Sequence, residues 1–200
     1  ASPSKGVIND QIDVAEMSRQ YRNGGAAAIS VLTEEVYFKG SLDDLIAVRE
    51  AVDLPILRKD FIVDEFQVFE SAAAGADVML LIVAAQDEPQ LSELYDLITD
   101  DLGMDAIVEV HTPFELETAA RIGAKIIGVN NRDLQTLEVS LDFSRELIPF
   151  RPPGSLMIAE SGISTIDEIG ELKSLGYDGF LIGEMLMKTG DPAALLGEWV

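Results

Sequence analysis

The chain alternates short, almost continuously apolar segments with longer segments in which apolar residues recur at helical spacing. Strands of a parallel sheet are buried on both faces and therefore read as near-continuous apolar runs. No strictly alternating apolar and polar pattern, typical of hairpins, interrupts the order. The clearest strand-like segments are residues 26–32, 78–83, 106–110, 126–129 and 180–182. The pattern predicts an α/β protein with a parallel sheet.

Seven strands are predicted, and a polar cluster or a glycine-containing turn follows most of them. Successive strand ends are 20 to 31 residues apart, which is room for one helix and one strand. The predicted ends are Leu32, Lys59, Ile82, Glu109, Val129, Glu160 and Gly183.

The helices between these strands carry recognisable start signals and apolar stripes. Hydroxyl and carboxylate side chains that suit an N-cap stand at Ser41, Asp64, Thr112, Ser164 or Thr165, and Asp191. Glycine-containing junctions precede most strands, as expected where helices end. Two stripes are predicted to belong to the core: Leu91, Leu94, Tyr95, Ile98 and Leu102, and Ile166, Ile169, Leu172 and Leu175.

Reactive side chains end several different strands, which favours a closed barrel over an open doubly wound sheet. Lys59, Glu109, Asn130 and Glu160 stand at or beside four strand ends. A TIM (β/α)8 barrel gathers such residues at one face, whereas an open sheet concentrates its site at one switch point. A barrel of this type has eight strands. We therefore expect residues 1–200 to form a single domain that lacks the first strand and the N-terminal helix.

Composition narrows the range of functions. The 36 acidic and 14 basic residues give a net charge of −22, which would repel a nucleic-acid backbone. No apolar run approaches the roughly 20 residues of a membrane span, so we expect a cytoplasmic protein. The chain has no cysteine, which excludes thiolate zinc sites and disulfides. The single histidine, His111, precedes a predicted helix start and is assigned no catalytic role.

Two charged residues are the leading candidates for proton transfer. Lys59 ends the predicted strand that contains the apolar pair Ile56-Leu57, and desolvation there would lower its pKa and make it a proton donor near neutral pH. Glu109 lies within an apolar segment, where burial would raise its pKa toward that of a useful base. The alternatives are a solvated strand-end lysine and a buried glutamate in a structural ion pair. Glu160, which is similarly placed, favours the catalytic interpretation.

The last two turns are candidates for phosphate binding. Ser161-Gly162-Ile163-Ser164 and Gly183-Glu184-Met185 each place glycine before a helix start, where free N–H groups can bind an anion. Ordinary capped turns are the alternative. Arg132 suits a carboxylate or phosphate, or an internal ion pair of its own turn. Phe38 and Phe61 lie just past strand ends and are candidates for contact with an aromatic substrate.

Six motifs together resemble indole-3-glycerol-phosphate synthase. They are Ser2-Pro3-Ser4-Lys5-Gly6, Ala28-Ile29-Ser30-Val31-Leu32-Thr33, Leu57-Arg58-Lys59-Asp60-Phe61, Val108-Glu109-Val110-His111, Asn130-Asn131-Arg132-Asp133-Leu134 and Glu160-Ser161-Gly162-Ile163. The resemblance covers essentially all 200 residues in order. It implies the ring closure, decarboxylation and dehydration of 1-(o-carboxyphenylamino)-1-deoxyribulose 5-phosphate in tryptophan biosynthesis, without a cofactor or metal.

The resemblance also implies roles for individual residues. Lys59 would be the general acid toward the ribulose carbonyl oxygen and Glu109 the base in the dehydration, while Asn130 and Glu160 would orient the substrate hydroxyls. Residues implied in phosphate or substrate contact are Ser2, Arg132, Ser161, Gly162, Gly183 and Glu184. Residues implied in the pocket around the aromatic ring are Phe38, Phe61, Leu81, Leu134 and Leu181.

One departure from the family separates the natural enzyme from these 200 residues. The family carries a catalytic Glu-x-Lys motif at the end of its first strand, ahead of the segment that matches Ser2-Pro3-Ser4. We therefore expect residues 1–200 alone to be nearly inactive. Two alternatives remain: a barrel similar to phosphoribosylanthranilate isomerase, against which the absence of cysteine counts, and a phosphate-ligand-binding fragment without catalysis. The sequence makes no prediction of oligomeric state.

Overall fold

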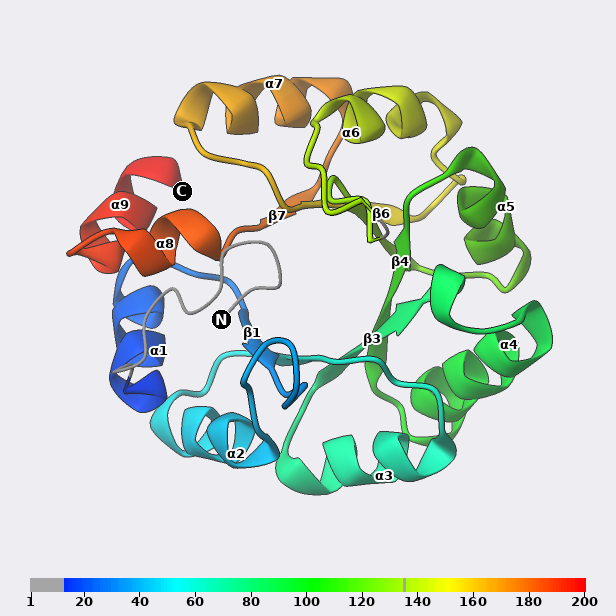
Figure 1. Ribbon diagram of the computed structural model, residues 1–200, viewed down its shortest axis with the longest axis horizontal. Coiled ribbons are helices and arrows are strands. Elements are labelled where there is room, and N and C mark those ends of the chain that lie inside the picture. Colours follow the sequence, from blue (N-terminus) through cyan, green and yellow to red (C-terminus); the bar gives the residue numbers. More distant parts are fainter. Residues whose placement is uncertain (1–12, 135) are drawn as a thin grey trace.

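The computed structural model describes residues 13–134 and 136–200, and its centre is a seven-stranded parallel sheet. The strands are hydrogen-bonded in chain order, so each pairs with the next one along the sequence. Figure 1 shows the sheet curled around the middle of the molecule. The strands are β1 (Ile29–Leu32), β2 (Ile56–Lys59), β3 (Val78–Ile82), β4 (Asp105–Val110), β5 (Ile126–Asn130), β6 (Leu156–Glu160) and β7 (Gly179–Leu181).

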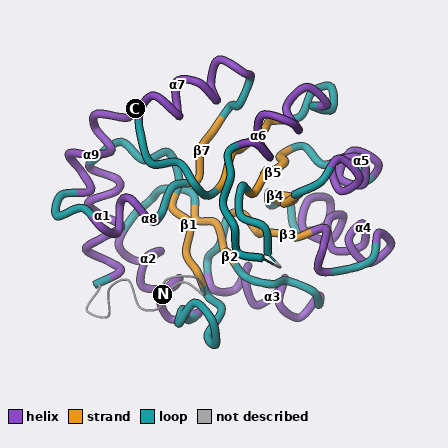
Figure 2. The backbone as a smooth tube through the Cα atoms, turned by 45° about the horizontal axis from the view of Figure 1, so that its top comes forward, coloured by secondary structure: helices purple, strands orange, loops and turns teal. Residues whose placement is uncertain are grey.

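Helices form an outer ring around the strands, as Figures 1 and 2 show. Most of them connect one strand to the next. They are α1 (Val14–Asn23), α2 (Leu42–Ala51), α3 (Glu65–Ala74), α4 (Glu88–Asp96), α5 (Pro113–Arg121), α6 (Asp142–Leu147), α7 (Ile166–Leu175), α8 (Glu184–Lys188) and α9 (Pro192–Trp199). Short turns of other helix types are η1 (Val83–Ala85), η2 (Leu97–Asp101) and η3 (Ile148–Phe150). This is an α/β fold of the TIM type.

The seven predicted strands are all present, with small differences in where they end. β4 continues to Val110 and β5 to Asn130, each one residue beyond the predicted end. β7 ends at Leu181, two residues before Gly183. In the part of the chain that the structure describes, β1 and β7 are the two edges of the sheet. The expected absence of a first strand and N-terminal helix is not confirmed by the described residues.

Alternate residues of each strand face opposite layers, and both layers are apolar. Leu57, Leu80, Ile82 and Ile107 form a cluster that Ile126, Ile158 and Leu181 join from β5, β6 and β7. This cluster is the inner layer of the curled sheet. The residues between them, such as Leu81, Val108 and Ile127, pack against the helices in the larger outer core. Full burial of one such side chain stabilises the fold by roughly 1.5–3 kcal/mol.

The predicted helix starts are confirmed. The side chains of Ser41, Asp64, Thr112, Thr165 and Asp191 each accept a hydrogen bond from a backbone N–H in the first turn of the helix that follows. At α7 the predicted choice between Ser164 and Thr165 is resolved in favour of Thr165, which forms a reciprocal capping box with Glu168.

One predicted apolar stripe is confirmed and the other holds only at its centre. Leu91, Leu94, Tyr95 and Ile98 are buried, and Leu102 packs against them. In α7, Ile169 and Leu172 are buried, but Ile166 is 46% exposed and Leu175 is 43% exposed. Their assignment to the core was therefore wrong. They occupy the first and last positions of α7, where no further turn of that helix covers them.

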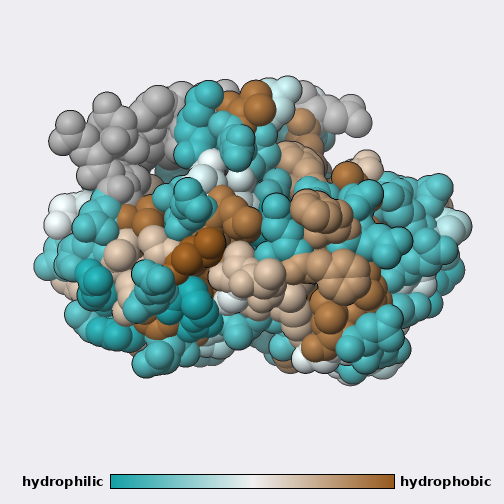
Figure 3. All heavy atoms as spheres, turned by 90° about the horizontal axis from the view of Figure 1, so that it is seen from below, coloured by the Kyte–Doolittle hydropathy of each residue, from teal (hydrophilic) through white to brown (hydrophobic). Residues whose placement is uncertain are grey.

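The outer surface is mostly polar, with scattered apolar side chains. Ile46 on α2 and Phe66 and Phe69 on α3 are exposed. Figure 3 shows apolar patches among hydrophilic atoms on the side of the molecule where α2 and α3 lie in Figure 1. Within residues 13–134 and 136–200, no helix has the length and apolar character needed to cross a membrane.

The capping box of α7 gives a direct test of how the helices are delimited. Replacement Thr165→Ala removes the acceptor for the Glu168 N–H and should lower the free energy of unfolding by about 1 kcal/mol. Thr165→Ser keeps the hydroxyl and should cost much less. Urea denaturation of both variants measures the difference, and equal losses for Ala and Ser would show that the hydroxyl does not cap this helix.

Candidate active site

Three charged side chains from alternate strands meet at the carboxyl ends of the strands. Lys59 ends β2, Glu109 lies near the end of β4 and Glu160 ends β6. The Lys59 Nζ lies 3.1 Å from Glu109 Oε2 and 2.7 Å from Glu160 Oε2. Each residue stands two positions after an inner-layer residue, so all three side chains point toward the inside of the sheet. The structure thus brings together three of the strand-end side chains that the sequence analysis singled out.

Asn130, at the end of β5, completes the partners of Glu109. Its Nδ2 donates to Glu109 Oε1 at 3.0 Å, and its Oδ1 accepts from the Arg132 N–H at 3.0 Å. Both oxygens of Glu109 therefore have partners. Glu160 differs, because its Oε1 is buried and has no hydrogen-bond partner among the described residues. Its Oε2 accepts a hydrogen bond from Lys59 Nζ.

The pKa of Lys59 changes in the direction opposite to the sequence prediction. Burial by itself would lower the pKa, as predicted. The negative charges of Glu109 and Glu160 outweigh that effect and raise the pKa of Lys59 above its ordinary value. Lys59 is thus held firmly protonated, and the predicted lowering was wrong because its two partners come from distant parts of the chain.

The two carboxylates have opposite pKa shifts. Burial would raise the pKa of Glu109, but the charge of Lys59 and the hydrogen bond from Asn130 hold it below its ordinary value. The predicted raised pKa of Glu109 was therefore wrong. Burial raises the pKa of Glu160 to about 7, and the negative charge of Glu109 adds to this effect while Lys59 opposes it. Glu160, rather than Glu109, is the carboxyl that can hold a proton near neutral pH.

Asn131 is a residue of the site that the sequence analysis missed. Its side chain is fully buried, and its Nδ2 donates to the carbonyl oxygens of Glu160 and Ser161 at 3.1 and 3.2 Å. Its Oδ1 accepts from the Ser144 N–H at 3.1 Å. Ser161 has φ of +66°, a left-handed conformation that is costly for a residue with a side chain. Asn131 therefore stabilises the strained turn that follows Glu160 through these hydrogen bonds. In the sequence, the two consecutive asparagines at a strand end were the signal that could have indicated it.

The two predicted phosphate turns differ in structure. The N–H groups of Ser164 and Thr165 are bonded to the Glu168 carboxylate, so that part of the first turn is an ordinary capped helix start. Ser161 and Gly162, both left-handed, remain beside Glu160. In the second turn, α8 begins after Gly183, which has no side chain with which to cap the helix. The Glu184 carboxylate lies 2.6 Å from Lys188 Nζ and 3.9 Å from Arg132 Nη2.

Of the residues predicted to surround the aromatic ring, some lie at the inner side or the carboxyl end of the strands and one does not. Leu181 belongs to the inner layer, and Phe61 and Leu134 are about two-fifths exposed just past β2 and β5. Phe38 is half-buried in the loop between β1 and α2. Leu81 is fully buried on the helix side of β3, so its assignment to a substrate pocket was wrong. Side chains alternate along a strand, and the inward positions of β3 are Leu80 and Ile82. Ser2 lies outside the described residues.

His111 lies next to the site, with its Nε2 at 2.8 Å from the Arg132 carbonyl oxygen and 4.0 Å from Glu109 Oε1. Burial would lower its pKa, but the Glu115 and Glu109 carboxylates outweigh this and raise the pKa. These contacts connect the segments that follow β4 and β5, as a structural residue would.

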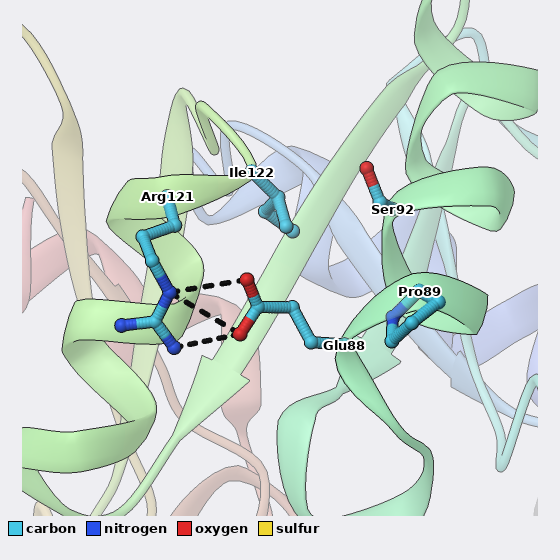
Figure 4. A pocket seen from close by; sticks show the side chains of 5 residues that line it. All are labelled: Glu88, Pro89, Ser92, Arg121 and Ile122. Carbon is cyan, nitrogen blue, oxygen red and sulfur yellow. Dashed lines mark hydrogen bonds and ion pairs between the residues drawn. The ribbon is translucent and has the colours of Figure 1, made fainter.

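A groove of about 420 Å³ lies elsewhere, on the outer ring between α4 and α5. Figure 4 shows its lining residues, Glu88, Pro89, Ser92, Arg121 and Ile122. The Arg121 guanidinium and the Glu88 carboxylate form an ion pair in it, with 2.7 Å between Nη2 and Oε2. Because neither residue comes from a strand end, this groove is separate from the Lys59 cluster.

Sequence comparisons identify close relatives. Residues 1–198 match the model of the family described as indole-3-glycerol phosphate synthase. A protein of that name from Laribacter hongkongensis is 48% identical over 98% of this chain and 74% of its own length. One from Mycobacterium avium is 50% identical over the whole of this chain and 73% of its own length. The comparisons do not bear out the expectation that residues 1–200 alone are nearly inactive.

Comparisons with solved structures support the fold alone, since their sequences are distant. A 3-hexulose-6-phosphate synthase from Salmonella typhimurium has a TM-score of 0.77 and 16% identity, covering 96% of this chain and 93% of that one. A thiamine phosphate pyrophosphorylase from Pyrococcus furiosus has a TM-score of 0.72 and 19% identity, covering 94% of this chain and 88% of that one.

Because the pKa values of Glu160 and Glu109 shift in opposite directions, replacing each glutamate with glutamine should change the stability of the fold differently. In the unfolded chain Glu160 loses its proton in the ordinary carboxyl range, but in the folded chain only near pH 7. Its contribution to stability is thus lost as pH rises across that window. Glutamine cannot ionise. As the pH rises from 5 to 8, the stability of Glu160→Gln should therefore increase relative to that of the parent, by on the order of 2 kcal/mol.

Glu109→Gln is the matched comparison. The lowered pKa of Glu109 means that its ionised form stabilises the fold above the ordinary carboxyl range. This variant should therefore lose stability relative to the parent by a similar amount at pH 5 and pH 8, because both lie above that range. Urea denaturation of both variants at pH 5 and pH 8 measures the two trends. Parallel trends for the two variants would contradict the assignment.

Proposed function

The chain belongs to the indole-3-glycerol phosphate synthase family, and we propose that Lys59, Glu109, Asn130 and Glu160 perform the proton transfers and substrate orientation of that reaction. The family is a group of lyases that release carbon dioxide in tryptophan biosynthesis. The single observation that best supports the proposal is the position of the Lys59 ammonium, within 3.1 Å of both carboxylates at the carboxyl end of the barrel strands.

In the first step Lys59 acts as the general acid. The aromatic carbon that bears the carboxylate attacks the ribulose carbonyl carbon, and a carbon–carbon bond forms while the carbonyl electron pair moves to oxygen. That oxygen takes a proton from Lys59. A raised pKa suits this role, because the lysine is fully protonated at the start and a developing alkoxide is a stronger base than the amine. Carbon dioxide then leaves, and its bonding electrons restore the aromatic ring.

In the dehydration Glu109 acts as the base. Its lowered pKa keeps it ionised and able to accept a proton from the intermediate. The hydroxyl leaves as water with a second proton, a role that fits the lysine of the Glu-x-Lys motif that the resemblance places ahead of Ser2. Asn130 holds Glu109 in place through its Nδ2, and Glu160 orients the substrate hydroxyls beside Lys59.

The rest of the substrate is bound by the turns and apolar residues around this cluster. We assign the phosphate to the backbone at Ser161, Gly162 and Gly183 and to the N–H of Glu184 at the start of α8. Arg132 and Ser2 are assigned to further substrate contacts. Phe38, Phe61, Leu134 and Leu181 are assigned to the aromatic ring, and Leu80 replaces Leu81 because it faces the inner layer.

We further propose that a strand carrying the Glu-x-Lys motif pairs between β7 and β1. The support is that β1 and β7 are the two edges of the described sheet, and that the relatives are longer, with this chain covering about three-quarters of their length. A cytoplasmic location and a phosphorylated small-molecule substrate are part of the same proposal. The net charge of −22 argues against a nucleic-acid partner.

Substitution of the two proton-transfer groups tests the assignment. In the full-length protein, Lys59→Ala and Glu109→Gln should each lower kcat by roughly 10²–10⁴-fold, the range lost with a positioned acid or base. Lys125→Ala is the control, because Lys125 is exposed and lies just before the amino end of β5. Formation of the indole product and release of carbon dioxide are both measured. Unchanged rates in Lys59→Ala and Glu109→Gln, with the parent active, would refute these roles.

A further inference from the structure

Gly128 lies in the middle of β5, on the same inner face as Ile126 and Asn130. A Cβ atom built on Gly128 would lie 2.1 Å from Glu160 Oε1, 3.0 Å from Ile107 Cγ2 and 3.1 Å from Glu160 Cδ. Such separations are shorter than van der Waals contact. The Glu160 carboxylate therefore occupies the space that any other residue at position 128 would need for its side chain.

The backbone does not require glycine here. Among the glycines with left-handed φ values Gly128 is absent, and it pairs regularly with Glu109 on β4 and Ile158 on β6. Glycine inside a strand weakens it by roughly 0.5–1 kcal/mol relative to alanine and often marks a close approach of another group. Here the approaching group is a buried carboxylate of the candidate site.

We propose that Gly128 is a positioning residue, which leaves room for the Glu160 carboxylate to lie against the β5 backbone within hydrogen-bond distance of the Lys59 ammonium. This inference rests on the proposed function of Glu160. Gly128 itself touches no reacting atom. It acts by keeping Glu160 Oε2 at 2.7 Å from Lys59 Nζ and Oε1 in a place without a hydrogen-bond donor.

The surroundings of Glu160 Oε1 favour the protonated form of this carboxyl group. An Oε1 that faces Gly128 and no N–H or O–H group gains nothing from being charged, which agrees with a Glu160 pKa raised to about 7 by burial. A Cβ at position 128 moves the carboxylate away from this place. The severe clash, at 2.1 Å, is with the end of a flexible side chain, so the carboxylate moves while the fold is retained. Ile107 Cγ2, at 3.0 Å, needs to shift by only a few tenths of an ångström.

Gly179 on β7 offers a matched control. Gly128 and Gly179 pair with the same residue, Ile158, from opposite sides of β6. A Cβ on Gly179 would meet only Ile158 Cγ1 at 3.6 Å, an ordinary van der Waals contact. Gly179→Ala therefore adds the same methyl group on β7, the other strand that flanks β6, without touching Glu160.

The experiment compares Gly128→Ala and Gly179→Ala in the full-length protein. We expect Gly128→Ala to lower kcat at least tenfold. The ionisation of Glu160 in the pH profile of kcat/KM should also move to lower pH, because the displaced carboxyl group is less desolvated. Gly179→Ala should leave both unchanged. Equal effects of the two substitutions, or an unchanged profile in Gly128→Ala, would overturn the inference.

A double-mutant cycle with Glu160→Gln separates this inference from the proposed function. If Gly128 acts only through the Glu160 carboxyl, adding Gly128→Ala to Glu160→Gln should change kcat less than twofold. Full multiplication of the two effects would overturn the inference. Full activity of Glu160→Gln would instead overturn the proposed function of Glu160. A large loss in Glu160→Gln with none in Gly128→Ala would overturn the inference alone.

A second variant covers the case in which Gly128→Ala does not fold. Glu160→Asp shortens the side chain by one methylene and withdraws the carboxylate from position 128. The double variant Gly128→Ala with Glu160→Asp should then fold as well as Glu160→Asp alone, measured by circular dichroism and urea denaturation. Failure of that double variant to fold would show that the methyl group clashes with something other than the carboxylate.

Discussion

The site depends on one lysine placed between two buried carboxylates. Two carboxyl groups that both contact one lysine away from water repel each other when ionised, and they ionise at all only because a cation lies between them. Lys59 supplies that cation, and each carboxylate in turn keeps the lysine charged. Since the three residues end β2, β4 and β6, the geometry of alternate barrel strands brings together groups that are 50 and 101 positions apart from Lys59.

The surrounding residues make the two carboxylates unequal. Glu109 has partners on both oxygens, from Lys59 and Asn130, and is therefore the ionised member of the pair. Glu160 has a partner on one oxygen only and faces Gly128 with the other. Two carboxyl groups whose environments push their pKa values apart are a common basis for separate catalytic roles. The different hydrogen-bond partners thus give Glu109 and Glu160 different pKa values, although both are glutamates.

Features that depend on local sequence were predicted well. The strands and the helix starts follow from apolar runs and capping residues, whose effects act within a few positions, and they are confirmed at Thr165 and the other caps. The site residues Lys59, Glu109, Asn130 and Glu160 were predicted to meet because strand ends of a barrel share one face. The family resemblance named the reaction, and the motifs that carry it are local as well.

The sequence predicted that side chains from different strands would meet, but it predicted poorly how they affect one another. The pKa of Lys59 was predicted to fall because its two carboxylate partners are not visible near it in the sequence. Leu81 was placed in the pocket by the family resemblance, but one position along a strand decides which face a side chain occupies, and Leu80 is the residue that faces inward. Gly128 and Asn131 were overlooked, since their importance lies in the space and hydrogen bonds that they offer to β6. Apart from Leu81, each of these errors concerns a neighbour in space that is remote in sequence.

The most direct test of this account is a carbon-13 NMR titration of the glutamate side-chain carboxyl groups, with Glu109 and Glu160 assigned by their Gln variants. The account predicts that Glu160 keeps its proton up to about pH 7 while Glu109 ionises below the ordinary carboxyl range. Titration of both groups together in the ordinary range would contradict it, because Lys59 would then not bridge two unequal buried carboxylates.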